Sequence, residues 1–269
     1  MRSQRRRLDL LAVARGLAPT RHQAEAAIRA GELYVDGRRV DKPGALVAES
    51  AGLERRARGP SYVSRGGVKL AAALDAFGVA VAGAVALDVG AATGGFTDCL
   101  RQRGARRVYA VDVGRGLLHW RLRQDPRVVV MEGRHAARLT PADLPEQVDL
   151  VTVDCSFISL HKILPAVAAL VRPGGAVVAL VKPQFEAGPK AAPRGVVRDP
   201  EVHQQVLRRV IASGPALGLW PHGVTVSPLL GPDGNREFFV LFRKDGGPTA
   251  DDLDAAIRRV AHAGWGGAP

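Results

Sequence analysis

The stretch Ala86-Leu-Asp-Val-Gly-Ala-Ala-Thr-Gly-Gly-Phe-Thr-Asp98 combines an apolar strand, a glycine-rich turn and the start of a helix. In an open α/β sheet, such a turn lies at the carboxyl end of a strand and forms a nucleotide-sized pocket. The spacing of Gly90, Gly94 and Gly95 differs from the dinucleotide fingerprint, whose three glycines follow a tighter pattern around a pyrophosphate. We expect Asp88 inside this turn, where its negative charge disfavours an anionic ligand.

A ligand with a cationic or neutral head fits this turn better. S-adenosylmethionine carries a sulfonium and an amino group, so we expect it as the cofactor. Asp112 ends the second strand, where a carboxylate can accept hydrogen bonds from ribose hydroxyls; a helix N-cap is the alternative. Glu132 ends the third strand, where an adenine edge would lie. The expected cofactor-binding residues are Asp88, Gly90, Ala91, Thr93, Gly94, Gly95, Phe96, Asp112 and Glu132.

The composition of the chain is that of a basic globular protein. Its 269 residues are 46% hydrophobic, with no apolar run near the roughly 18 residues of a membrane span. The basic start lacks an apolar signal region, so we expect a cytoplasmic protein. Cys99 and Cys155 lack metal-ligand spacing, and we expect free thiols and no metal. The net charge of +12 suggests a nucleic-acid partner, although an arginine-rich genome would give the same excess.

The first segment reads as a small α+β domain. It contains a short helix at 8–17 and a second helix that is capped by Thr20 and stopped by Gly31. A hairpin over 32–40 follows, because Asp36-Gly37 is typical of a type I′ turn. The domains expected are this small domain at 1–58, a linker at 59–63, a catalytic domain at 64–246 and a tail at 247–269.

The central segment alternates strands and helices after a first helix at 68–77. This alternation predicts an α/β fold with a doubly wound, mostly parallel sheet. A late hairpin around Pro232-Asp-Gly-Asn235 is a feature of the methyltransferase version of that fold. After the first strand, further strands are expected at 108–113, 128–132, 150–154, 176–181, 223–227 and 237–243.

Four charged residues stand where packing would favour apolar ones. Lys69 interrupts an apolar helix start, and Asp154 and Lys182 end apolar strands. Glu237 opens the last strand. Buried charges are costly unless they are paired, so we expect a cluster. The cluster could be a structural ion network, or a site in which a lysine deprotonates or orients a hydroxyl.

Several motifs carry a resemblance to a known family. The phrase at 29–40, Arg-Ala-Gly-Glu-Leu-Tyr-Val-Asp-Gly-Arg-Arg-Val, resembles the S4 RNA-binding module. The motifs at 64–70, 87–97, 153–159, 180–186 and 234–238 resemble the TlyA (haemolysin A) family. These proteins are S4-domain rRNA 2′-O-methyltransferases with an FtsJ-like catalytic domain.

The resemblance spans about 7–244 and implies a seven-stranded class I methyltransferase sheet. It implies methylation of cytidine ribose in 16S rRNA, 23S rRNA or both, by a catalytic tetrad of Lys69, Asp154, Lys182 and Glu237. One departure is the linker, Gly59-Pro-Ser-Tyr-Val63, where relatives carry Arg-x-Trp-Val; any role of the linker in cofactor binding is therefore in doubt. The expected RNA-binding residues are Arg7, Arg15, Arg21, Arg29, Arg38, Arg39, Arg65 and Phe157.

Alternatives remain at this point. Phe157 could stack on a flipped target base or belong to the core. The chain could be an inactive RNA-binding assembly factor, or it could methylate bases, although Asp154-Cys-Ser-Phe157 replaces the usual Asn/Asp-Pro-Pro-aromatic loop. A pore-forming haemolysin lacks support, since no long amphipathic hairpin or signal peptide is present. We expect a monomer that acts on ribosomal subunits without metal or membrane.

Overall fold

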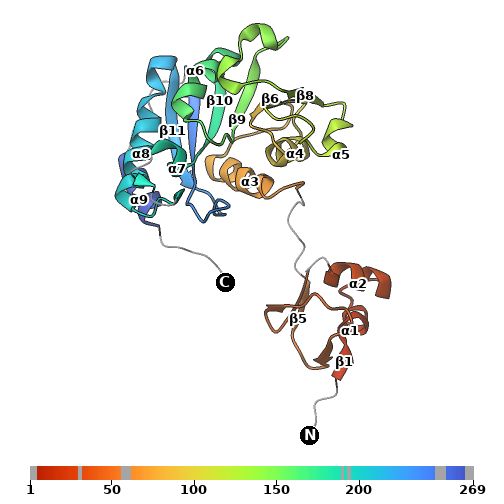
Figure 1. Cartoon of the computed structure of the whole chain (residues 1–269). Coiled ribbons are helices and arrows are strands. Elements are labelled where there is room, and N and C mark those ends of the chain that lie inside the picture. Colours follow the sequence, from red (N-terminus) through yellow and green to blue (C-terminus); the bar gives the residue numbers. More distant parts are fainter. Residues whose placement is uncertain are drawn as a thin grey trace. The chain divides into compact units, whose positions relative to one another are not determined.

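The computed structural model describes residues 5–29, 32–55, 62–188, 191–192, 195–245 and 253–263. The chain divides into two compact units, Met1–Ser61 and Tyr62–Pro269 (Figure 1). The division falls inside the expected linker, of which residues 59–61 lie outside the described part. Residues 247–252 and 264–269 of the expected tail also lie outside it.

The first unit packs two helices on short strands. Its apolar core centres on Leu8, Ile28 and Leu33, all fully buried. Positive φ angles at Asp36 and Gly37 confirm the predicted turn. The elements are β1 (Arg5–Arg7), α1 (Leu8–Ala14), α2 (Arg21–Arg29), β2 (Leu33–Val35), β3 (Arg38–Arg39), β4 (Leu46–Ala48) and β5 (Leu53–Arg55), with β1 paired to β4 and a second sheet in the order β3-β2-β5.

The first helix is shorter than predicted. It ends at Ala14, and Gly16 follows with a φ of +72°. A left-handed residue stops the helical hydrogen-bond pattern, and glycine adopts that conformation at little cost. The second helix begins as predicted, because the Thr20 hydroxyl accepts a hydrogen bond from the Gln23 amide at 3.2 Å.

The second unit contains a seven-stranded sheet in the order β11-β12-β10-β9-β6-β7-β8. β12 runs antiparallel to both of its neighbours, and the other neighbouring strands are parallel. The predicted doubly wound sheet with a late hairpin is thereby confirmed. Its strands are β6 (Val85–Val89), β7 (Arg107–Asp112), β8 (Val128–Glu132), β9 (Val148–Val153), β10 (Val171–Val181), β11 (Leu219–Val226) and β12 (Phe238–Lys244).

Helices cover both faces of this sheet. α3 (Gly66–Phe77) and α4 (Gly95–Gln102) pack against one apolar layer of strand side chains. α6 (Leu160–Leu170), α8 (Pro200–Ala212) and α9 (Leu253–His262) pack against the opposite layer. Helix α9, which the sequence places in a tail, therefore buries its apolar side within the second unit.

The connection from β8 to β9 differs from the expected helix. It consists of two 3-10 turns, η1 (Ala136–Arg138) and η2 (Pro141–Asp143). Thr140 caps the second turn together with Asp143, and prolines at 141 and 145 remove amide donors. The connection from β7 to β8 has one short helix, α5 (Trp120–Arg123).

Candidate active site

The predicted glycine turn lies between β6 and α4. Gly90 has a φ of +86°, and a Cβ there would lie 2.3 Å from the carbonyl oxygen of Asp154. Gly94 has a φ of +97°, and a Cβ there would clash with Leu122. Both positions therefore require glycine, because the backbone is left-handed and closely approached. Helix α4 begins at Gly95, directly after the turn.

Asp88 lies in a different place from the one expected. It is inside β6, before the turn, and it is fully buried. Its carboxylate accepts hydrogen bonds from the hydroxyls of Thr97 at 2.7 Å and Thr152 at 3.0 Å. Burial raises the pKa of Asp88 to about 7. The carboxylate of Asp88 therefore joins strand β6 to α4 and β9 and does not lie in the turn itself.

Two further carboxylates hold the loop that follows β7. Asp112 accepts from the Ala92 amide at 2.8 Å and from the Gly114 amide at 2.7 Å, so it lies beside the glycine turn. Glu132 accepts from the Gly116 amide at 2.9 Å and pairs with Arg123. Both acids are at carboxyl ends of neighbouring strands, where the sequence predicts them.

Two cavities meet at the glycine turn. One, of about 350 Å³, is lined in part by Lys69. The other, of about 600 Å³, extends over Asp112 toward Phe157. Gly90, Ala92 and Asp154 line both. This space has the volume of a typical small-molecule site and lies where open α/β sheets bind ligands.

The expected cluster contains two charged pairs, of which the first is buried. Lys69 Nζ donates a hydrogen bond to Glu237 Oε2 at 2.5 Å, and both side chains are less than a tenth exposed. Burial raises the pKa of Glu237, and the positive charges of Lys69 and Lys182 oppose that rise.

The second pair lies nearer the surface. Lys182 Nζ is 2.6 Å from Asp154 Oδ1. Although this is an ionic contact, Oδ1 receives no hydrogen bond from any described residue. Since Lys182 and Asp154 both act electrostatically on Glu237, the structure brings all four predicted charges into one cluster.

Sequence reasoning missed two polar residues of this region. Ser156 Oγ accepts a hydrogen bond from Lys182 Nζ at 3.0 Å. Asn235 is fully buried; its side chain accepts from the Val197 amide and donates to the Gly195 carbonyl. Both residues are inside the motifs that carry the family resemblance, but neither interrupts an apolar pattern, which was the signal used for the four charges.

Phe157 and Arg65 border the cavities. Phe157 is 90% exposed, which contradicts a place in the core. Arg65 is exposed, and its guanidinium donates to the Leu230 carbonyl at 2.9 Å. The loop before β12 is thereby held against the start of α3.

The arginines of the first unit fall into two groups. Arg7 and Arg21 both donate to the buried carboxylate of Asp9, whose pKa falls to about 2, chiefly through the hydrogen bond from Arg7. Arg15 donates to the carbonyls of Ala51 and Glu49. These three arginines thus stabilise the fold locally. Arg29 and Arg38 are exposed, and the side chain of Arg39 lies outside the described part.

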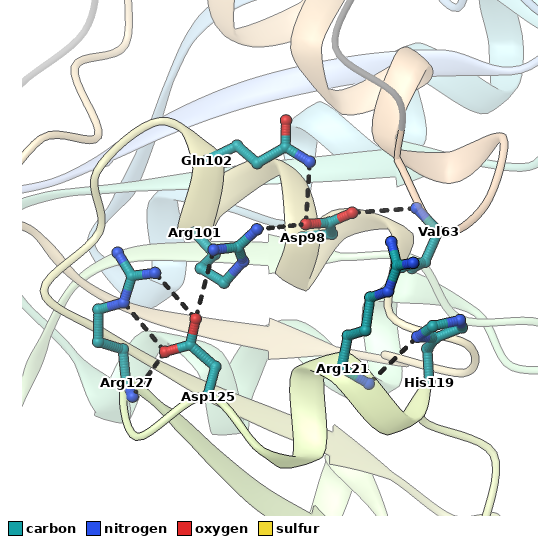
Figure 2. A network of polar contacts seen from close by, with 8 residues as sticks. All are labelled: Val63, Asp98, Arg101, Gln102, His119, Arg121, Asp125 and Arg127. Carbon is teal, nitrogen blue, oxygen red and sulfur yellow. Dashed lines mark hydrogen bonds and ion pairs between the residues drawn. The ribbon is translucent and has the colours of Figure 1, made fainter. Parts of the chain in front are cut away.

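The segment that enters the second unit is tied to α4. The Tyr62 ring packs so closely on Gly67 that a Cβ there would lie 2.2 Å from it. Figure 2 shows Asp98 between the Val63 amide, which donates to it at 3.0 Å, and the side chains of Arg101 and Gln102. Tyr62 therefore has a packing role here.

Comparisons with known proteins agree with this geometry. Residues 62–244 match the family model of the FtsJ-like methyltransferases, and residues 6–51 match the S4 domain. The chain belongs to the FtsJ-like methyltransferase family. The match covers the whole sheet and all four clustered charges, and the S4 match covers most of the first unit.

Named relatives share most of the length of this FtsJ-like methyltransferase. It is 44% identical over 271 residues to the 16S/23S rRNA (cytidine-2′-O)-methyltransferase TlyA of Mycobacterium tuberculosis, covering 97% of this chain and 99% of the relative. It is 48% identical to YqxC of Bacillus subtilis, provisionally named an rRNA methyltransferase. That alignment covers 89% of this chain and 86% of the relative. A solved structure of a haemolysin-like protein from Streptococcus thermophilus is 42% identical and has a TM-score of 0.73. The match covers 96% of this chain and 95% of that one.

The described residues contain neither a membrane-spanning helix nor a group of metal ligands. No described helix is long and apolar enough to cross a membrane. The described histidines, cysteines and acids form no group of three or more that could hold a metal ion. Cys99 and Cys155 are free thiols.

Proposed function

We propose that this methyltransferase transfers a methyl group from S-adenosylmethionine to the 2′-hydroxyl of cytidine in ribosomal RNA of one or both subunits. The observation that carries the proposal is the pairing of Lys69 with Glu237 and of Lys182 with Asp154 beside the glycine turn. The names of the rRNA-modifying relatives and the S4 domain support rRNA as the substrate.

The residues around the turn fit the proposed cofactor. Asp112 has carboxylate lone pairs beyond those used by the two amides, and these can accept from ribose hydroxyls. Gly90 and Asp112 line the cavity of about 600 Å³, which has room for a ligand beside the turn. When bound, S-adenosylmethionine supplies an electrophilic methyl group on a sulfonium.

The charged cluster fits an acceptor hydroxyl. With its amine neutral, Lys182 accepts the proton of the 2′-hydroxyl while the ribose oxygen forms its bond to the methyl carbon and the sulfur–methyl bond breaks. Asp154 holds the amine, and Lys69 places positive charge near the developing alkoxide. The remaining work is to align the hydroxyl with the methyl group.

An exposed aromatic ring supports the choice of a nucleotide substrate. Phe157 projects beside the larger cavity, where a base turned out of its helix can stack on it. Arg29, Arg38 and Arg65 are exposed cations suited to phosphate contacts.

Transfer of tritium from labelled cofactor to isolated 30S and 50S subunits tests this proposal. We expect label in rRNA, at a position found by mapping. Cofactor binding without transfer to either subunit would instead support the inactive assembly factor. Isothermal titration with S-adenosylmethionine provides the binding measurement.

A further inference from the structure

Ser156 contacts the amine at the centre of the proposed site. Lys182 Nζ donates to Ser156 Oγ at 3.0 Å and lies 2.6 Å from Asp154 Oδ1. A lysine amine sits on a flexible four-carbon stem, so one contact leaves it several directions. The hydrogen bond to Ser156 and the ionic contact with Asp154 together restrict where this amine lies.

The backbone next to Ser156 is strained, and the ring of the strained residue packs against the segment that carries Lys182. Phe157 has a φ of +63°, which is a costly conformation for a residue with a side chain. Its ring lies 4.9 Å from that of Phe185, centroid to centroid. Phe185 belongs to the short helix α7 (Pro183–Glu186), which directly follows Lys182.

Glu186 joins the same two segments at their other end. Its carboxylate accepts from the Ser159 hydroxyl at 2.6 Å and from the Leu160 amide at 2.8 Å, at the start of α6. A carboxylate at a helix start is favourable because it meets unpaired amides. Three successive contacts therefore link the loop after β9 to the segment that starts at Lys182. The contact between Ser156 and Lys182 is the one nearest the proposed reaction.

We propose that Ser156 is a positioning residue for Lys182. Its hydroxyl oxygen accepts a hydrogen bond from the amine, Asp154 forms the ionic contact, and both Ser156 and Asp154 line the cavity where an acceptor hydroxyl would bind. This inference rests on the proposed function, in which Lys182 accepts the proton of that hydroxyl. Ser156 acts through Lys182 and contacts no reacting atom itself.

Steady-state kinetics of methyl transfer to ribosomal subunits test this role. In Ser156→Ala we expect kcat to fall about 10- to 100-fold, because the Lys182 amine is then less well aligned with the acceptor hydroxyl. The KM values for cofactor and RNA stay unchanged, because neither ligand loses a contact. Ser156→Thr, which keeps a hydroxyl, restores most of the activity.

Ser213→Ala is the matched control. The Ser213 hydroxyl also makes one hydrogen bond, to the Val210 carbonyl at the end of α8, so this variant loses a similar contact outside the site. It should keep the wild-type kcat. A wild-type kcat in Ser156→Ala, or a loss that Ser156→Thr does not rescue, overturns the proposal for Ser156. Absence of transfer by the wild-type protein overturns the proposed function itself, and with it this role.

Discussion

The Nζ atom of Lys69 lies 2.5 Å from Oε2 of Glu237, although 168 residues separate the two along the chain. Lys69 is on the first helix of the second unit, and Glu237 directly precedes its last central strand. The buried pair therefore joins the two ends of the methyltransferase fold beside the cavity. Substitutions can separate what this pair contributes to folding stability from what it contributes to methyl transfer.

We expect Glu237→Leu to lower the free energy of unfolding by about 3–5 kcal/mol, because Lys69 is left buried without a partner. Lys69→Met alone should also destabilise. The double variant should regain most of the lost stability, since the charge is removed with its partner, but none of these proteins should transfer methyl groups. Urea unfolding measures the stability. Losses that simply add in the double variant would contradict a coupled pair.

Lys182→Ala should abolish methyl transfer and leave cofactor binding nearly unchanged. The reason is that Lys182 acts on the acceptor hydroxyl, whereas the cofactor is expected against the glycine turn and Asp112. Transfer assays and calorimetric titration with S-adenosylmethionine measure the two properties separately. Retained transfer would show that Lys182 is not the proton acceptor.

Asp88 should make the protein less stable as the pH rises from about 4 to about 7. Its pKa is about 7 in the folded protein against an ordinary value of 3.8, so the folded state binds more protons between these values. The stabilisation is complete below pH 4 and lost above pH 7. In Asp88→Asn this dependence disappears, and Thr97 and Thr152 can rotate their hydroxyls to suit the amide.

Urea midpoints of Asp88→Asn and the wild-type protein, measured from pH 4 to 8, test this sign. The variant should gain stability relative to the wild type as the pH increases. Parallel pH profiles for the two proteins would mean that Asp88 titrates in the folded state as it does in the unfolded chain.

Substituting the exposed arginines of the S4 domain should weaken rRNA binding, whereas substituting a paired one should mainly lower folding stability. Arg29→Ala and Arg38→Ala should each weaken rRNA binding and lower the salt dependence by about one phosphate contact. Arg21→Ala should mainly lower folding stability, because the buried carboxylate of Asp9 loses a donor. Binding to subunits at several salt concentrations and urea unfolding measure the two effects.

Arg106→Ala serves as the control for those arginines. Arg106 is an exposed residue of the second unit that directly precedes β7 and pairs with Glu146. It lines neither of the two cavities at the glycine turn. Its removal should leave both rRNA binding and the salt dependence unchanged. An equal loss of affinity in Arg106→Ala would indicate that total charge, and not the S4 surface, governs binding.

Much of this fold could be predicted because its signals are local. The glycines at 90 and 94, the turn at Asp36-Gly37 and the cap at Thr20 each determine a backbone conformation within a few residues. The four charged residues could be selected because each interrupts or ends an apolar run. Asp154 and Lys182 pair because β9 and β10 are parallel neighbours whose carboxyl ends meet at one edge of the sheet.

The remaining features depend on distant partners. Asp88 is buried because Thr152, 64 residues away, and Thr97 supply donors to it. Arg7 and Arg21 are expected RNA contacts in the sequence, and only the structure shows that both also pair with the buried Asp9. Ser156 has no sequence signal of its own, since its role depends on where Lys182 lies. No local pattern encodes such partnerships.

The most direct test is to incubate the protein with S-adenosylmethionine and ribosomal subunits, digest the rRNA to nucleosides and identify the methylated product by mass spectrometry. The two lysine–carboxylate pairs predict a 2′-O-methylated nucleoside, and the names of the relatives predict that it is cytidine. This product should be absent when Lys182→Ala replaces the wild-type protein. A methyl group on a base, with the ribose unmodified, would contradict the assignment of the acceptor.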